Sequence, residues 1–284
     1  MKSKSHVLTP EHIHRYVLYL REEEHAPATI QRYTHDLSVL MSYLHGRPVT
    51  KAMLISWKEN LITVYAPSTV NTMLAAVNGF LNFLGWRECK VKLLKLQKSI
   101  FCDTARELTR AEYVRLVSAA QREGNRRLSL VIQTICATGI RVSELKCITV
   151  EAIKTGRAEI TNKGKHRTVF LPAKLRRLLR QYLKSQKITA GPVFITRTGK
   201  PLDRSNIWRD MKQLCGSAGV EPGKVFPHNL RHLFARTYYL LERDLSRLAD
   251  ILGHSSINTT RIYTAESGGI HARQLERMGL ILTT

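Results

Sequence analysis

Apolar residues recur at the spacing of an α-helix along most of this chain, and this periodicity constrains the fold more than any other feature of the sequence. In the first hundred residues the apolar stripes are separated by prolines and glycines, which begin and end helices. Thr9 and Pro10, for example, form the cap and the first position of the first helix. The pattern predicts four helices: Glu11–Arg21, the segment from Pro27 to Gly46, Lys51–Leu61 and Ser68–Leu84.

A second helical region begins at Thr109, which forms with Glu112 the capping box T-R-A-E. A mostly apolar helix is predicted over residues 129–137 and is stopped by Gly139. Helical spacing resumes at Leu175 and continues through much of the remaining chain.

Between these helices lies the one clear β pattern. Residues 157–162 and 166–171 are short extended runs joined by the basic tripeptide 163–165, which predicts a β-hairpin. One further short strand is predicted at residues 192–195. The expected fold class is therefore mainly α with a small antiparallel β-sheet.

Charge is unevenly distributed along the chain. Residues 1–104 hold 13 Lys or Arg and 8 Asp or Glu, a balance of +5, whereas residues 105–284 hold 32 and 14, a balance of +18. The segment from Lys90 to Arg106 has no clear period, and we place a linker there. The expected organisation is a helical domain, a linker, a second domain and a C-terminal tail helix, at residues 1–94, 95–106, 107–268 and 269–284.

The net charge of +23, from 45 basic and 22 acidic residues, points to a polyanionic partner. Helices that bind membrane surfaces concentrate their cations in one segment, whereas these cations are spread along the whole chain, so DNA or RNA is favoured over a membrane. No apolar run approaches the roughly 18 residues that cross a bilayer, and the first ten residues do not resemble a signal sequence. We expect a soluble, cytoplasmic protein.

The five cysteines are scattered and never form a C-x-x-C pair. Neither a disulfide framework nor a zinc site is indicated, and we interpret them as reduced, mostly buried thiols. No cluster of Asp and Glu resembles a two-metal nuclease site. We therefore expect chemistry that uses no metal and no other cofactor.

Five short stretches place an Arg, His or Lys beside a glycine, a turn or a helix start, where side chains converge. Each is weak by itself, because a single Arg is most often a surface cation and an isolated Tyr is usually a packing residue. Residues three apart on a helix face the same way, so Glu144 can hold Arg141 by an ion pair. His228 and Arg231 are also three apart, so both can bind the same phosphate. The stretches cover residues 137–145, 162–165, 228–232, 252–254 and 260–263.

Taken together and in this order, the stretches resemble, almost letter for letter, the boxes of the tyrosine recombinase family, also called the phage integrase family. The first box reads T-G-x-R-x-S-E-L, the second H-x-L-R-H-x-F-A and the third L-G-H-x-S-x-x-T-T-x-x-Y. A hairpin with G-K-G or N-K-G lies between the first two. The boxes match residues 138–145, 228–235 and 252–263, and the hairpin matches residues 162–164.

The resemblance implies a helical core-binding, SAM-like domain followed by an α+β catalytic domain. It also implies a site-specific DNA recombinase, independent of metal and ATP, that works through a 3′-phosphotyrosine and a Holliday junction in integration, excision or resolution. The implied partner is double-stranded DNA with an inverted-repeat core site, bound by two protomers per site and four in the synapse. The length of the chain favours an Xer-like or transposon-encoded resolvase. The tail helix is expected to dock on a neighbouring protomer, with packing on its own domain as the alternative.

The roles of the site residues follow from the same resemblance. Tyr263 would be the nucleophile that attacks the scissile phosphorus. Arg141 and Arg231 would fork onto the non-bridging oxygens of the transition state, a geometry that lysine lacks. His254 would donate a further hydrogen bond to the same phosphate.

The leaving 5′ oxygen needs a proton, which the resemblance assigns to Lys163 at the hairpin tip. Lys165 stays open as the alternative acid, because the register of a hairpin tip is not defined by its sequence. His228 would assist the attack as a base or hold the phosphate, and Glu144 would orient Arg141.

Two rival functions are retained: a non-catalytic DNA-binding protein and a type IB topoisomerase that relaxes supercoils through the same phosphotyrosine. Tyr263 beside five cationic partners disfavours the first, since binding alone does not need them together. The substrate separates the second, because recombination needs two copies of one site. Tyr238 and Tyr239 lie in an apolar helix, so we interpret them as packing residues rather than nucleophiles.

Overall fold

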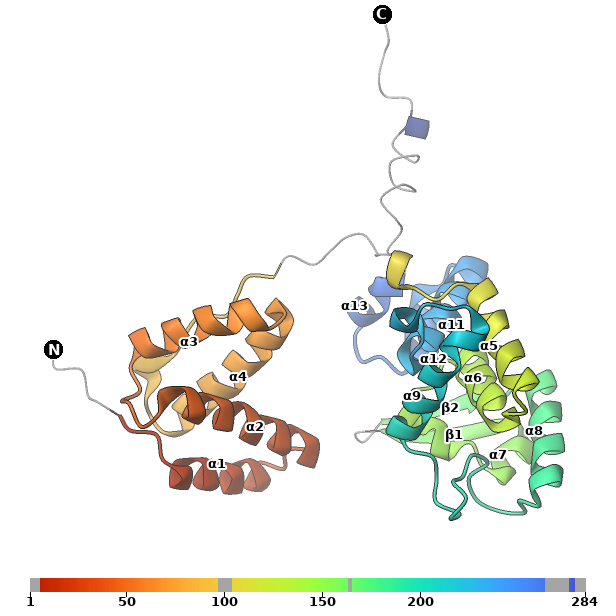
Figure 1. The fold of residues 1–284 in the computed structure, drawn as a ribbon, viewed down its shortest axis with the longest axis horizontal. Helices are drawn as coiled ribbons and strands as arrows, with labels where there is room; N and C mark the ends of the chain where they lie inside the picture. The colour runs from red at the N-terminus through yellow and green to blue at the C-terminus, as the bar shows by residue number, and fades with distance from the viewer. Residues whose placement is uncertain (1–5, 97–103, 163–164, 264–275, 279–284) are drawn as a thin grey trace, which may run out of the picture. The chain divides into compact units, whose positions relative to one another are not determined.

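The computed structural model describes residues 6–96, 104–162, 165–263 and 276–278 (Figure 1). The chain divides into two compact units, Met1–Lys98 and Ser99–Thr284. Lys163 and most of the predicted tail helix lie outside the described residues. No helix in the described part of the chain is long and apolar enough to cross a membrane.

The first unit is a bundle of four helices, as the periodicity predicted, with ends within three residues of the expected ones (Figure 1). Three of the four begin with a proline in their first turn, where its missing N–H costs nothing. Leu37, Trp57, Leu74 and Phe80 are buried between them. The helices are α1 (Pro10–Glu22), α2 (Pro27–Leu44), α3 (Lys51–Val64) and α4 (Pro67–Phe83), followed by the 3-10 turn η1 (Arg87–Cys89).

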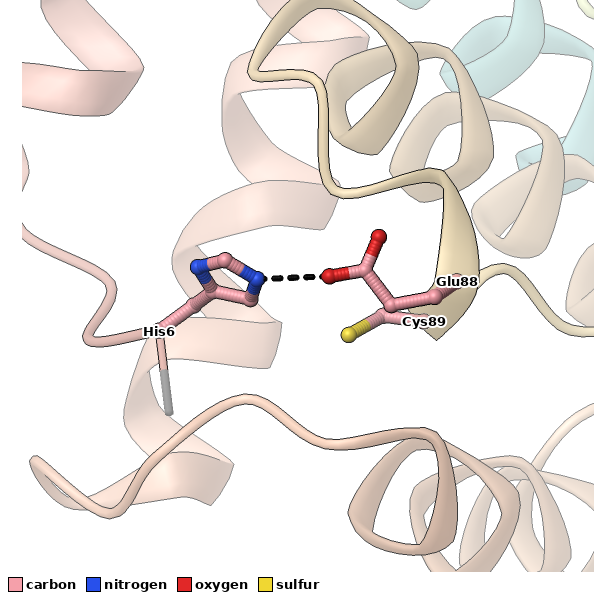
Figure 2. A group of neighbouring side chains, drawn as sticks. All are labelled: His6, Glu88 and Cys89. Carbon is pink, nitrogen blue, oxygen red and sulfur yellow. Dashed lines mark hydrogen bonds and ion pairs between the residues drawn. The ribbon is translucent and has the colours of Figure 1, made fainter. Parts of the chain in front are cut away.

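A small cluster joins the beginning of the first unit to its end (Figure 2). The His6 ring stacks on Trp86 at 4.4 Å, and its Nε2 lies 2.7 Å from Oε1 of Glu88. The neighbouring Cys89 thiol donates to the carbonyl of Val49 at 3.6 Å. The ligand atoms of His6, Glu88 and Cys89 lie within 4.8 Å of one another, a grouping that the sequence did not predict. Each of these side chains contacts another residue of the first unit, so we interpret the cluster as contacts that hold the amino-terminal segment in place.

The second unit is mostly helical, and its first α-helix begins with the capping box predicted at Thr109, whose backbone N–H donates to Glu112 Oε2 at 2.8 Å. Its 3-10 turns are η2 (Thr104–Arg106), η3 (Val142–Cys147), η4 (Pro222–Lys224) and η5 (Arg261–Tyr263). Its helices are α5 (Arg110–Arg122), α6 (Arg126–Thr138), α7 (Val150–Thr155), α8 (Ala173–Gln186), α9 (Arg204–Gln213), α10 (Cys215–Ala218), α11 (Pro227–Glu242), α12 (Leu245–Leu252) and α13 (Ile257–Thr260).

The predicted hairpin is present as β1 (Arg157–Asn162) and β2 (Lys165–Phe170), paired antiparallel. Lys165 pairs with Asn162, so two residues rather than three connect the strands. The strand expected at residues 192–195 is wrong. Its backbone makes only isolated bridges to two different partners, one residue each, and no ladder forms.

The main core of the second unit surrounds α6, where Ile132 and Ile135 are fully buried. A smaller cluster of Ala235, Leu248, Leu252 and Tyr263 lies under the residues 234, 238 and 239 of α11. Tyr238 and Tyr239 therefore pack as expected, although Leu240 beside them is 62% exposed. The structure is mainly helical with one small antiparallel sheet, and the smaller cluster holds the end of the third box against α11.

Candidate active site

The first box forms a sharp reversal after α6. Gly139 ends the helix with a left-handed backbone (φ +64°), and an added Cβ would lie 2.4 Å from the Phe234 ring. The chain then places Arg141 before η3, a 3-10 turn rather than the α-helix that the sequence indicated. The expected ion pair is present: Nη1 of Arg141 donates to Glu144 Oε1 at 2.9 Å, and its backbone N–H donates to Oε2 at 2.7 Å.

The second box begins α11, where Pro227 occupies the first turn just before His228. Arg231, one turn further, is only 2% exposed. Its Nη1 donates to the carbonyl of Gly139 at 2.5 Å and its Nη2 to that of Leu252 at 2.8 Å. Burial first, and then the nearby Arg141, lower the pKa of Arg231 to about 10, so it is still charged at neutral pH.

Arg141, His228 and Arg231 line one hollow of about 380 Å³ at the amino-terminal end of α11. His228 is open to solvent on one side, yet its pKa is lowered by desolvation and by Arg231, Arg141 and Arg204. It is therefore neutral at pH 7 and able to accept a proton. The amino terminus of a helix adds positive potential, so the hollow favours an anion.

The third box places His254 beside Arg231. Gly253 ends α12 with a left-handed backbone (φ +66°) and turns the chain so that Nε2 of His254 lies 3.0 Å from Nη2 of Arg231. Because a guanidinium can only donate, Nε2 accepts and the ring proton is on Nδ1, which donates to Thr260 Oγ1 at 2.8 Å. Burial and the surrounding arginines lower the pKa of His254 to about 4.

Tyr263 is 4% exposed and lies in η5 between two histidine rings. The His254 ring stacks on it at 6.0 Å, and the His232 ring meets it edge-on at 4.8 Å. His232 also contacts the ring of His228 at 4.5 Å. Burial first, and then His228 and Arg231, lower the pKa of His232 to about 4. Tyr263 acts against the lowering of the Arg231 pKa.

The structure thus gathers Arg141, Glu144, His228, Arg231, His254 and Tyr263 in one part of the second unit. Lys163 lies outside the described residues, and Lys165 is described only as the first backbone pair of β2.

Sequence reasoning missed several groups that the fold brings to this site. Arg204 and Trp208 of α9 line the same hollow, and Arg167 of β2 binds Glu144. No local pattern distinguishes these residues from the many other basic and aromatic side chains. Thr260 and His232 are different, because both lie inside the matched boxes, where their position alone could have marked them.

The family model described as "Phage integrase family" matches residues 106–268, more than half of the chain and all of the residues just described as a site. The chain belongs to this family, the tyrosine recombinases. A second model, the phage integrase N-terminal SAM-like domain, matches residues 13–88, which cover the four-helix bundle.

Named relatives and solved structures agree with this assignment. The chain is 28% identical to the tyrosine recombinase XerA of Pyrococcus furiosus over 285 residues, which cover 96% of each chain. A crystal structure of XerA recombinase is 25% identical, with a TM-score of 0.52, and covers 97% of this chain and 100% of that one. A lambda integrase dimer bound to a core site is 16% identical with a TM-score of 0.75, covering 92% and 96%, and shows a shared fold.

Proposed function

We propose that this member of the phage integrase family is a site-specific DNA recombinase that cuts and rejoins strands through a 3′-phosphotyrosine. Its substrate is double-stranded DNA with an inverted-repeat core site, and two cleaved sites exchange strands through a Holliday junction. The outcome is integration, excision or resolution of a mobile element or a replicon dimer. The relatives named tyrosine recombinase XerA and XerC support this class of reaction.

One observation carries the proposal. Arg231 is a buried cation whose hydrogen-bond partners, among the described residues, are two carbonyls and an imidazole rather than a carboxylate. A buried charge is costly unless an opposite charge compensates it. Arg231 lines the hollow that it shares with Arg141 and His228, so an anion bound there supplies the missing compensation. A backbone phosphate has the charge and the oxygens to accept from both guanidiniums.

The proposed step is a transesterification. The phenol oxygen of Tyr263 forms a bond to the scissile phosphorus while the bond from phosphorus to the 5′ oxygen breaks. Arg141 and Arg231 stabilise the charge that develops on the non-bridging oxygens. The neutral His228 takes the phenol proton or holds the phosphate. No external energy is needed, because the phosphodiester energy is kept in the new bond.

His254 adds a condition to this scheme. Its Nε2 accepts from Arg231 in this structure, so a hydrogen bond from Nε2 to the phosphate needs the proton to move from Nδ1 to Nε2. A phosphate oxygen that takes over the Nη2 donor of Arg231 favours that tautomer. We propose that DNA binding and the tautomer of His254 are linked in this way.

Lys163 is the proposed general acid for the 5′ oxygen. Its replacement by Ala should reduce cleavage by about 100-fold or more, the usual effect of losing a general acid. A duplex with a bridging 5′ sulfur should restore Lys163→Ala selectively, because the thiolate leaves without protonation. Equal impairment of both substrates would assign Lys163 to phosphate binding, and Lys165 would become the acid to test.

The function is tested with Tyr263→Phe. The wild-type protein, incubated with a pool of random-sequence duplexes and then denatured, should stay covalently linked to strands that reveal its site. Tyr263→Phe should bind the recovered site but form no adduct. Tyr239→Phe is the matched control, since Tyr239 packs against the same small cluster, and it should keep the adduct. An adduct with Tyr263→Phe would refute the assigned nucleophile.

Relaxation of a supercoiled plasmid separates the type IB topoisomerase alternative. We expect the protein to recombine two copies of the recovered site and to leave plasmids without the site supercoiled. Rapid relaxation of a plasmid without the site would favour the topoisomerase. Binding without any adduct would favour the non-catalytic DNA-binding protein.

We further propose that protomers join on DNA through the tail at residues 269–284. An apolar hollow of about 320 Å³ on the second unit is lined by α5, α6 and α11 residues, including Tyr113, Phe234 and Leu241. Leu241 is 75% exposed, and an exposed apolar patch of this kind fits a helix with apolar side chains. Truncation after Gly268 should leave folding intact and weaken cooperative binding to the full site in gel shifts. A fall in monomer stability alone would show that the tail packs on its own protomer.

A further inference from the structure

Arg167 lies in β2, opposite Ile160 of β1, and its side chain is only 13% exposed. Its guanidinium reaches from the sheet to residues of the first and third boxes. Nη2 donates to Glu144 Oε2 at 2.7 Å, and Nη1 donates to the carbonyl of Leu252 at 2.9 Å. Arg167 does not line the hollow that Arg141 and Arg231 share.

Glu144 is shared between two arginines. Oε1 accepts from Nη1 of Arg141, while Oε2 accepts from the Arg141 backbone and from Arg167. The carboxylate is 4% exposed and cannot rely on water to hold its direction. Arg167 therefore sets the orientation of Glu144, and Glu144 in turn sets the orientation of the Arg141 guanidinium. A bidentate, charge-assisted arrangement of this kind is stronger and more directional than a neutral hydrogen bond.

The other end of Arg167 reaches the third box. The carbonyl of Leu252 accepts from both Arg167 and Arg231, at 2.9 and 2.8 Å. Gly253 packs so closely that an added Cβ would lie 2.6 Å from Nη1 of Arg167. Arg167 therefore contacts the turn that positions His254 as well as the carboxylate that positions Arg141.

We propose that Arg167 is a positioning residue for the transition-state cations, acting through Glu144 on Arg141 and through the Leu252 carbonyl on Arg231 and His254. The inference rests on the proposed function. It also links the β2 strand, whose turn carries Lys163, to the phosphate-binding side chains. A displacement of about 1 Å in a catalytic group can cost on the order of 100-fold in rate. A residue that holds the catalytic groups in place therefore has a measurable effect on the rate.

The test replaces Arg167 by Met and uses Arg176→Met as the matched control. Arg176 of α8 covers the left-handed Gly156 at the end of α7 and donates to the carbonyls of Ile153 and Lys154. Like Arg167, it lies against a left-handed glycine that ends a helix and donates to a carbonyl near that end. Any loss from removing an arginine that caps carbonyls should be common to both variants.

The substrate is the duplex recovered from the wild-type adduct, with protein in saturating excess. We expect Arg167→Met to slow adduct formation by about 10- to 100-fold while DNA affinity changes by less than about 3-fold. Arg176→Met should change neither by more than about 3-fold. Thermal unfolding of both variants reports their stability. Slowing by Arg167→Met that does not exceed the Arg176→Met effect would overturn the inference.

Two further measurements distinguish positioning from stability. A methylphosphonate at the scissile position has a methyl group in place of one non-bridging oxygen, so its transition state carries less negative charge for Arg141 to stabilise and the defect of Arg167→Met should shrink. In a Glu144→Gln background, Arg167→Met should slow adduct formation much less than in the wild type. Both changes disrupt the same contact, from Arg167 through Glu144 to Arg141. An undiminished defect on methylphosphonate, or additive losses with Glu144→Gln, would refute positioning through Glu144. Absence of a Tyr263 adduct in the wild type would instead refute the proposed function.

Discussion

The two units bury different kinds of side chain. The described part of the chain holds eight buried polar or charged residues, and only Asp36 belongs to the first unit. The first unit is otherwise closed by apolar side chains such as Leu37 and Leu74. The second unit buries seven, although Thr134 and Thr138 donate back to carbonyls of α6, a common use of Thr in helices, and Ser129 accepts from Gln133 of the same helix. The seven are Ser129, Thr134, Thr138, Glu144, Asn229, Arg231 and Thr260.

The difference lies in what the buried groups contact. Burial raises the pKa of Asp36, and its Oδ2 has no hydrogen-bond partner within the described structure. Glu144, Arg231 and Thr260 instead belong to one network that includes Arg141 and His254. An apolar core is enough to hold a helical bundle together, whereas buried charges linked to one another are typical of a catalytic site.

The largest effect that sharpens this comparison is expected from Arg231→Lys. A single ammonium cannot donate to two carbonyls and a phosphate in the planar geometry of Arg231, so cleavage should fall by about 100- to 1,000-fold. Arg47 of the first unit also donates to two carbonyls at a helix end, and Arg47→Lys should leave cleavage almost unchanged. Rates of adduct formation and DNA affinity measure both. An affinity loss as large as the cleavage loss would contradict a transition-state role for Arg231.

A cavity created in the core of one unit should destabilise that unit and not the other. Leu74 and Leu116 are both fully buried, one in each unit, and replacing either by Ala should lower the free energy of unfolding of its own unit by about 2–5 kcal/mol. Hydrogen exchange measured on peptides from each unit distinguishes the two. Leu74→Ala should increase exchange only in the first unit and Leu116→Ala only in the second. Equal loosening of both units by Leu74→Ala would show that they unfold together.

Two left-handed glycines offer a smaller contrast. Gly46 of the first unit has φ +77° and open space around it, so Gly46→Ala should cost only the backbone strain of about 1–2 kcal/mol. Gly139 has φ +64° and lies against Phe234, so Gly139→Ala should add about 1–3 kcal/mol of overpacking. Denaturant unfolding measures both costs. A Gly139→Ala cost no larger than that of Gly46→Ala would mean that the Phe234 ring moves aside freely.

The last contrast concerns pH. The pKa values of His232 and His254 are lowered from 6.5 to about 4 in the folded second unit. As the pH falls below 6.5, the unfolded chain binds protons at these histidines and the folded unit does not, so the free energy of unfolding decreases down to about pH 4. His232→Gln should make this decrease shallower. Chemical denaturation across the interval tests it, and an unchanged slope would contradict the lowered pKa of His232.

The sequence by itself determined the local features of this protein. Prolines and glycines at helix ends, the capping box at Thr109 and the hairpin at residues 157–171 depend on residues a few positions apart, so a linear reading finds them. The three boxes also identified the family and six side chains that the fold gathers. Their catalytic roles stay predictions, and Lys163 lies outside the described residues.

Tertiary structure decided everything that joins distant parts of the chain. Arg167 meets Leu252 across 85 positions, and Arg231 meets Gly139 across 92. Neither contact has a local pattern, because one basic residue in a strand or helix looks like any other until packing removes it from water. The exact register of the hairpin and the absence of a ladder at residues 192–195 were decided in the same way, by which backbone groups packing brings into reach. Helix and strand formation depends on residues that are close in the chain, whereas the burial and pairing of charged side chains in a site depend on residues that are close in space.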